Sequence, residues 1–250
     1  MWGDCVRNLL VIICYDGKNY HGWQIQKNAL SVQEVFQNAL KKVIYESPEI
    51  KGCSRTDTGV HANMYGISLK TGSKISCQTL IGALNRYLPP SVAVIDCCEA
   101  PMDFHARYSC LGKEYIYKIW NHKIRNPFLD GYALHYYYPL NVEKLDKASK
   151  SFIGEHDFTS FCTLDRRNPG NLVRHVKSFD VYKNGDIIEM KVHANGFLYN
   201  MVRIMVGTLF RIAQGKIGEA DIPKIIAAEN RREAGPTAPA HGLYLNKVFY

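Results

Sequence analysis

Apolar residues recur at two spacings along the chain, and these spacings predict a mixture of strands and helices. Short apolar or alternating runs between turn residues predict strands, whereas apolar residues three and four positions apart predict helices. The pair Asn184-Gly185 between two alternating runs predicts the tight turn of a β-hairpin. Strands are expected at residues 7–15, 65–71, 92–100, 113–120, 173–182, 187–194 and 243–249, and helices at 31–46, 76–88, 141–152, 198–213 and 222–229.

Two helix starts carry a local signal. Ser31 is followed by Glu34 in the pattern of a capping box, in which both side chains satisfy backbone amides of the first turn. Ser76 is expected to cap the next helix. Pro89 and Pro90 are expected to end that helix, because proline lacks the amide hydrogen that a helix uses.

The order of these elements predicts an α+β protein made of two similar α/β halves. Both halves mix strands with helices, and the hairpin favours mixed, largely antiparallel sheets. We expect residues 1–105 to form the N-terminal half and residues 106–250 the C-terminal half. The apolar run from Leu9 to Cys14 is too short to cross a membrane, so no membrane partner is expected.

Charge and cysteine content narrow the class of protein. The 250 residues include 31 Lys and Arg against 23 Asp and Glu, which gives a net charge of +8. This excess attracts polyanions, of which nucleic acid is the commonest, although an ordinary basic enzyme would show the same balance. The eight cysteines contain no C-x-x-C spacing. Without a signal peptide, they predict reduced thiols in a cytoplasmic protein rather than a zinc site or a disulfide framework.

The segment from Gly52 to Ala62 places an acid, Asp57, two residues after a base, Arg55, among small and flexible residues. A loop of this kind on a rigid scaffold presents side chains to a ligand, so Asp57 is a candidate catalytic carboxylate. A simple turn in which Asp57 hydrogen-bonds its own backbone is the alternative. The tripeptide that starts at Asp57 also occurs in aspartic proteases, but those enzymes need two aspartates that share a proton, and this chain has one copy.

Arg203 lies within residues 201–207, where the expected helix is apolar almost all round. A buried guanidinium is costly unless a carboxylate and hydrogen bonds meet it. The position therefore requires an acidic partner, and Asp57 is the best candidate. An arginine that snorkels at the edge of the core and a purely structural ion pair are the alternatives.

Aromatic residues are interleaved with basic ones along residues 113–118, shortly after Arg107 and Tyr108. Such interleaving suits base stacking combined with phosphate neutralisation. A half-buried strand whose tyrosines face the core would show the same pattern.

Residues 54–62 resemble the active-site loop of the TruA-type tRNA pseudouridine synthases. Ser54 and Thr58 stand where the family most often has Gly and Ala, which leaves the acid in place and affects only the fine geometry of the loop. The resemblance extends along the whole chain. Further segments similar to family signatures, in the expected order, are residues 15–17 with 20–24, 31–34, 104–107, 156–161, 197–207 and 242–245.

The resemblance implies the pseudouridine synthase fold, in which the two halves form one central sheet flanked by helices, with a basic cleft. It implies isomerisation of uridine to pseudouridine at positions 38, 39 and 40 of the tRNA anticodon stem-loop. It also implies a homodimer, and no metal or other cofactor. A catalytically silent tRNA-binding relative is the alternative, and an aspartic protease is a remote one.

The resemblance also implies residue roles. Asp57 is the essential carboxylate, and Arg203 is its partner. Tyr115 stacks on the target uracil, and Arg55 fills the space that a flipped base leaves. The residues expected to contact RNA phosphates are Arg107, Lys113, Lys123, Arg125, Arg166 and Arg167, each of which is otherwise a solvated surface charge.

Overall fold

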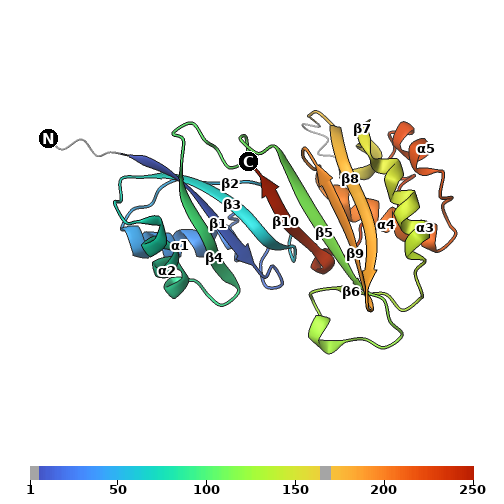
Figure 1. Ribbon diagram of the computed structural model, residues 1–250, viewed down its shortest axis with the longest axis horizontal. Helices are drawn as coiled ribbons and strands as arrows, with labels where there is room; N and C mark the ends of the chain where they lie inside the picture. The colour runs from blue at the N-terminus through green and yellow to red at the C-terminus, as the bar shows by residue number, and fades with distance from the viewer. Residues whose placement is uncertain (1–5, 164–169) are drawn as a thin grey trace. The chain divides into compact units, whose positions relative to one another are not determined.

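The computed structural model describes residues 6–163 and 170–250, and the chain divides into two compact units (Figure 1). The first unit extends from the N-terminal segment to Leu111 and includes Leu245–Tyr250, and the second is Gly112–Tyr244. The C-terminal residues thus join the sheet of the first unit, and the expected halves, residues 1–105 and 106–250, stay a prediction. Pairing between residues far apart in the sequence leaves no local signal from which this could be predicted.

The sheet of the first unit has the strand order β4-β1-β3-β10. β1 pairs antiparallel with β3 on one side and with β4 on the other, and β2 adds an antiparallel pair with β3. The register sets Val11 opposite Ile67 and Cys97, and all three side chains are buried. The bounds are β1 (Arg7–Tyr15), β2 (Ile50–Gly52), β3 (His61–Thr71), β4 (Val92–Ala100) and β10 (Leu243–Phe249).

Helices α1 and α2 lie beside the strands of the first unit (Figure 1). The hydroxyl of Ser31 accepts a hydrogen bond from the Glu34 N–H at 3.3 Å, and that of Ser76 accepts from the Thr79 N–H at 3.2 Å. The predicted serine caps are therefore confirmed. Helix α1 ends slightly earlier than expected, because Tyr45 takes a left-handed conformation with φ of 57°. The bounds are α1 (Val32–Ile44) and α2 (Cys77–Tyr87).

The sheet of the second unit has the order β5-β9-β8-β7, with β6 beside β5 in parallel. β8 and β9 form the predicted hairpin, with its turn one residue later than expected: Asn184 pairs with Ile187, so Gly185 (φ of 59°) and Asp186 form the turn. The bounds are β5 (Gly112–Trp120), β6 (Leu134–His135), β7 (Gly154–Asp157), β8 (Val173–Asn184), β9 (Ile187–Ala194), α3 (Val142–Ser149), α4 (Met201–Ala213) and α5 (Ile222–Ala227), with short 3-10 helices at Pro127–Leu129, Lys150–Phe152, Thr159–Phe161 and Ala240–Gly242.

Helix α4 is central to the core of the second unit. Ile204, Met205 and Leu209 have no exposed surface. A Cβ added at Gly207 would lie 1.7 Å from the carbonyl oxygen of Pro236, so only glycine lets that loop pack against the helix. The predicted start of this helix was too early, because Asn200 has a left-handed φ of 62° and the helix begins after it.

The predicted α+β class, with a mixed sheet flanked by helices, is confirmed. β3 begins at His61, before the expected start at Tyr65, and the short strands β2, β6 and β7 were not predicted. Within the part of the chain that the structure describes, no helix is long and apolar enough to cross a membrane.

Candidate active site

Asp57 lies on the loop that joins β2 to β3, in the first unit. Exposure alternates along this loop: Arg55 is exposed, Thr56 is buried and Asp57 is half-buried. Successive side chains of an extended backbone point to opposite sides. The loop therefore buries Thr56, whereas Arg55 and part of Asp57 are accessible to solvent.

The loop closes in a turn that starts at Asp57. The Val60 N–H donates to the carbonyl oxygen of Asp57 at 3.1 Å, and the Gly59 N–H donates to the carbonyl oxygen of Tyr20 at 3.2 Å. Gly59 has a φ of 78°, which glycine adopts without strain. A turn at Asp57, considered as the alternative, is thus present, and the backbone carbonyl of this residue takes part in it.

Hydrogen bonds anchor the part of the loop that precedes Asp57. The hydroxyls of Tyr15 and Thr56 lie 2.8 Å apart, and both groups are buried. The Thr56 carbonyl accepts a hydrogen bond from the Trp23 N–H at 3.3 Å. Two residues earlier, the carbonyl oxygen of Ser54 accepts a hydrogen bond from the Tyr65 hydroxyl. The backbone before Asp57 is therefore attached to two strands and to the segment before α1.

Two glycines allow the segment before α1 to pack directly against this loop. At Gly22, where φ is 81°, an added Cβ would lie 2.2 Å from the Thr56 carbonyl oxygen. At Gly17 it would lie 2.0 Å from the Val60 carbonyl oxygen. A side chain at either position would push the Asp57 loop outward.

His61, at the start of β3, ties the same loop to the end of β1. Its side chain is buried, and its Nδ1 accepts a hydrogen bond from the Gly17 N–H at 3.0 Å. The same nitrogen lies 3.2 Å from an Asp16 carboxylate oxygen.

We expect Gly22→Ala to destabilise the protein and displace the Asp57 loop. The left-handed backbone costs alanine about 1–2 kcal/mol, and the contact with the Thr56 oxygen adds to this cost. Thermal unfolding should show a melting temperature lower by at least about 2–4 °C. Gly82→Ala in α2, where an added Cβ meets no atom within 4 Å, should instead raise the melting temperature, because alanine favours helix. Equal melting temperatures for Gly22→Ala and wild type would contradict the packing described.

Arg203 lies in the first turn of α4 and is half-buried. Its Nε donates to the carbonyl oxygen of Ala238 at 2.7 Å, and its Nη1 donates to the side-chain oxygen of Asn200 at 2.9 Å. These neutral oxygens supply part of the hydrogen bonding that a guanidinium on an apolar helix requires. The predicted ion pair with Asp57 joins residues of different units and stays a prediction.

Tyr115 and Tyr117 lie on β5, in the second unit. The Tyr115 ring is 6% exposed and meets Phe197 edge to face, with the ring centres 5.0 Å apart. The Tyr117 hydroxyl donates to the carbonyl oxygen of Pro239 at 2.9 Å. Burial raises the pKa of Tyr117, and the positive charge of Arg203 acts in the opposite direction. Tyr117 therefore stays protonated and holds the loop before β10. The stacking of Tyr115 on the target uracil stays a prediction.

The other predicted RNA contacts lie in both units. Arg107 is exposed, with its guanidinium carbon 5.6 Å from the centre of the Tyr108 ring. Lys113 is half-buried on β5, and Lys123 and Arg125 are exposed on the loop after it. Their contact with phosphate stays a prediction. The remaining two predicted contacts, Arg166 and Arg167, lie outside the described residues.

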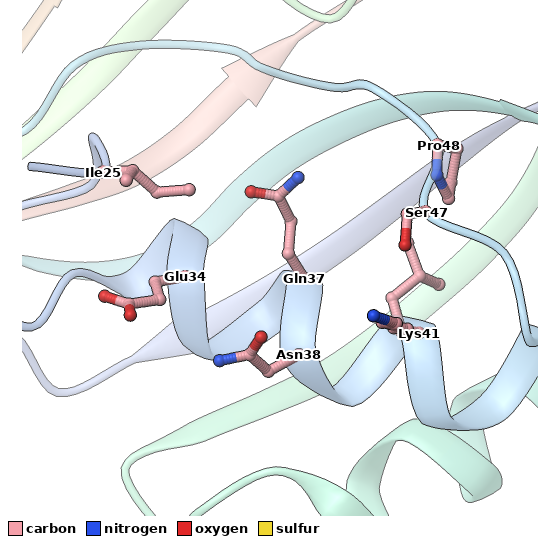
Figure 2. Close-up of a pocket in the computed structure, with 8 residues that line it drawn as sticks. Ile25, Glu34, Gln37, Asn38, Lys41, Ser47 and Pro48 are labelled. Atoms are coloured by element: carbon pink, nitrogen blue, oxygen red, sulfur yellow. The ribbon is translucent and has the colours of Figure 1, made fainter.

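A separate hollow of about 260 Å³ lies beside α1 in the first unit (Figure 2). Gln37 and Lys41 project from the helix, and Ser47 and Pro48 belong to the segment that follows it. No residue of the Asp57 loop lines this hollow, so it is distinct from the candidate site. Its lining residues are Ile25, Glu34, Gln37, Asn38, Leu40, Lys41, Ser47 and Pro48.

Some residues that hydrogen-bond to residues of the candidate site were identified only from the structure. The sequence pattern did not identify Tyr65, Asn200 or Ala238 as partners of candidate residues. Asn200 alone carries a usable signal, because asparagine tolerates the left-handed conformation that precedes α4. Within residues 6–163 and 170–250, no group of three or more His, Cys, Asp or Glu side chains is arranged to hold a metal ion.

Comparison with known proteins gives matches over nearly the whole chain. A family model described as tRNA pseudouridine synthase matches residues 11–109 and 148–250. The tRNA pseudouridine synthase A of Thermoanaerobacter sp. (strain X514) is 46% identical over 245 residues, which cover 98% of this chain and 100% of that protein. The protein of the same name from Ruminiclostridium cellulolyticum is 45% identical over 246 residues, with the same two coverages.

Solved structures are more distant. An archaeal box H/ACA sRNP Nop10–Cbf5 complex contains a chain that is 13% identical to this one, with a TM-score of 0.37. The match covers 81% of this chain and 42% of that chain. The functional assignment therefore depends on the sequence relatives.

Proposed function

The chain belongs to the tRNA pseudouridine synthase family and isomerises uridine in tRNA to pseudouridine, and we propose that Asp57 is the essential carboxylate of this reaction. We propose further that the target uridines are those at positions 38, 39 and 40 of the anticodon stem-loop. The observation that carries the assignment of Asp57 is its place on the turn of a doubly anchored loop whose neighbouring side chains alternate between buried and exposed.

The reaction breaks the C1′–N1 glycosidic bond, rotates the uracil and joins C1′ to C5. The hydrogen on C5 leaves as a proton, and N1 gains one, so nothing is oxidised and nothing is added. The stoichiometry therefore requires neither a redox cofactor nor a second substrate. A carboxylate serves this chemistry as a nucleophile or as a stabiliser of positive charge on the sugar. Attack of Asp57 on C1′, attack on C6 and abstraction of a 2′ proton are all compatible with this role.

Arg203 is proposed as the counter-charge of Asp57. An adjacent guanidinium favours the ionised carboxylate and offsets its desolvation in a closed, RNA-filled site. The hydrogen bonds of Arg203 to Ala238 and Asn200 limit the orientations of its guanidinium. Support for the role comes from the position of Arg203 as a half-buried cation on an otherwise apolar helix face.

The proposed contacts with the substrate begin with the need to bring the target uridine to Asp57. A stacked base cannot reach a carboxylate, so the target uridine is flipped out of the stem. Tyr115 stacks on the flipped uracil, and the exposed Arg55 fills the vacated space. Asp57 is contributed by the N-terminal part of the chain, and Tyr115 and Arg203 by the C-terminal part. Phosphate contacts are assigned to Arg107, Lys113, Lys123, Arg125, Arg166 and Arg167.

The proposal also covers the oligomeric state and the cellular location. The chain acts as a homodimer, as the TruA-type resemblance implies, and it works in the cytoplasm, where tRNA is modified.

The direct test uses two transcripts of one tRNA. The first carries uridine at positions 38, 39 and 40, and the second carries other nucleotides there with base pairing restored. After incubation with the purified protein, nucleoside chromatography should detect pseudouridine only in the first transcript. Equal conversion of both transcripts would overturn the proposed target, and conversion of neither would point to a catalytically silent relative.

We expect tRNA affinity to fall steeply with added salt, because phosphate contacts release counterions. With six such contacts, affinity should fall roughly a thousandfold between 50 and 200 mM salt. Arg125→Gln should reduce the logarithmic salt slope by about one. Lys224→Gln is a matched control, because Lys224 is paired with Asp221 at 3.0 Å and should leave the slope unchanged. Affinity that does not depend on salt would exclude the phosphate contacts.

A further inference from the structure

One buried hydrogen bond lies directly beside the proposed carboxylate. The hydroxyl oxygens of Tyr15, at the end of β1, and Thr56, the residue before Asp57, are 2.8 Å apart. Tyr15 is 4% exposed and Thr56 is 9% exposed. A buried hydroxyl that lacks a hydrogen-bond partner raises the free energy of the folded state, so this bond favours the position of Thr56 in which its hydroxyl meets that of Tyr15.

The surroundings of this pair limit movement of the loop in several directions. The Tyr15 ring lies 5.8 Å from the Tyr65 ring, which in turn stacks on Trp23 at 4.3 Å. The backbone N–H of Trp23 also donates to the carbonyl of Thr56. Thr56 is therefore held through its side chain and its carbonyl at once, by groups that pack against one another.

Holding Thr56 has a geometric consequence for its neighbours. Side chains alternate in direction along this stretch, so a buried Thr56 turns both Arg55 and Asp57 outward. The Asp57 carbonyl is then fixed from the other side by the Val60 N–H. Rotation of Thr56 away from Tyr15 would redirect the carboxylate of the next residue.

We propose that the hydroxyl bond between Tyr15 and Thr56 is a positioning device that aims the Asp57 carboxylate at the target nucleotide, a proposal that rests on the proposed role of Asp57. Neither hydroxyl contacts the reacting atoms. Both act through the backbone of the loop, and the reaction is sensitive to them because small displacements of a reacting group lower the rate strongly.

The test compares Tyr15→Phe and Thr56→Val, which each remove one hydroxyl and keep the shape of the side chain. We expect kcat for pseudouridine formation to fall about 10- to 100-fold in each variant, with KM for tRNA within about threefold of wild type because the phosphate contacts are unchanged. Thr56→Ser keeps the hydroxyl and should restore most of kcat. The double variant should be about as slow as the slower single variant, because both changes remove the same bond.

The control is a second hydroxyl pair in the same unit. The Tyr20 hydroxyl and the Ser91 Oγ are 2.7 Å apart; Ser91 lies outside the Asp57 loop, which Tyr20 meets through its backbone carbonyl rather than through this hydroxyl. Ser91→Ala removes a similar bond and should leave kcat unchanged. A merely structural role for the Tyr15–Thr56 bond would lower the melting temperature of Tyr15→Phe and Thr56→Val while kcat of the folded protein stayed normal. If Thr56→Val does not fold, as judged by circular dichroism, Tyr15→Phe decides the question alone.

The outcomes separate this proposal from the one on which it rests. Full activity of Asp57→Ala would overturn the role of Asp57 and the positioning proposal with it. An inactive Asp57→Ala together with normal kcat in Tyr15→Phe and Thr56→Val would overturn the positioning proposal alone. Additive losses in the double variant would show that the two hydroxyls act independently, which also contradicts it.

Discussion

Asp57→Ala abolishes pseudouridine formation and leaves tRNA binding nearly intact: this is the largest effect that we expect from any single substitution. Removal of a group that acts directly on the reacting atoms lowers the rate by at least about ten-thousand-fold. Affinity should stay within about tenfold of wild type, because phosphate contacts dominate binding. Single-turnover assays with excess enzyme give the rate, and filter binding gives the affinity.

The control for this prediction is another carboxylate of the same unit. Asp103 is exposed and lies outside the Asp57 loop. Asp103→Ala should therefore turn over normally, and both variants should unfold at temperatures close to that of wild type. Undiminished turnover in Asp57→Ala would show that another group carries the reaction.

We expect the Arg203→Met protein to fold and its single-turnover rate to be about 100- to 1,000-fold lower. Removal of one group that stabilises charge in an enzyme active site typically lowers the rate by this factor. Methionine keeps the apolar character of α4, whereas the Ala238 and Asn200 oxygens lose a donor each. We expect the lost hydrogen bonds to cost about 1–3 kcal/mol of stability. Thermal unfolding checks this cost separately from the rate.

Two further variants isolate the cause of the effect at Arg203. Arg203→Lys keeps the charge without the planar fork and should have an intermediate rate. Arg211→Met removes a half-buried arginine from the last turn of the same helix and should leave the rate unchanged. Wild-type turnover in Arg203→Met would mean that Asp57 does not depend on this guanidinium.

Local signals predicted much of the fold. The β8–β9 hairpin and the helix cap at Ser31 depend on residues within a few positions of each other, and both are confirmed, with the hairpin turn one residue later than expected. The short strand β7 left no such signal. It exists because it pairs with β8, from Gly154 opposite Val176 onward, and four residues alone have no period that would identify a strand.

In the candidate site, too, the local sequence identified some features, whereas others depend on contacts between distant residues. The resemblance of residues 54–62 to a family loop identified Asp57, because the acid and its neighbours are contiguous in the sequence. The bond between Tyr15 and Thr56 spans 41 positions, and that between Arg203 and Ala238 spans 35. Both bonds arise from tertiary packing, which sequence spacing does not encode.

The most direct measurement of the central claim is a nucleotide-resolution map of pseudouridine in bulk unmodified tRNA after incubation with the purified protein. Carbodiimide adducts on pseudouridine stop reverse transcription and locate each modified position. We predict new stops at positions 38, 39 and 40 wherever these are uridine, and none with Asp57→Ala. Stops confined to other parts of the tRNA, or the same stops with Asp57→Ala, would contradict the account.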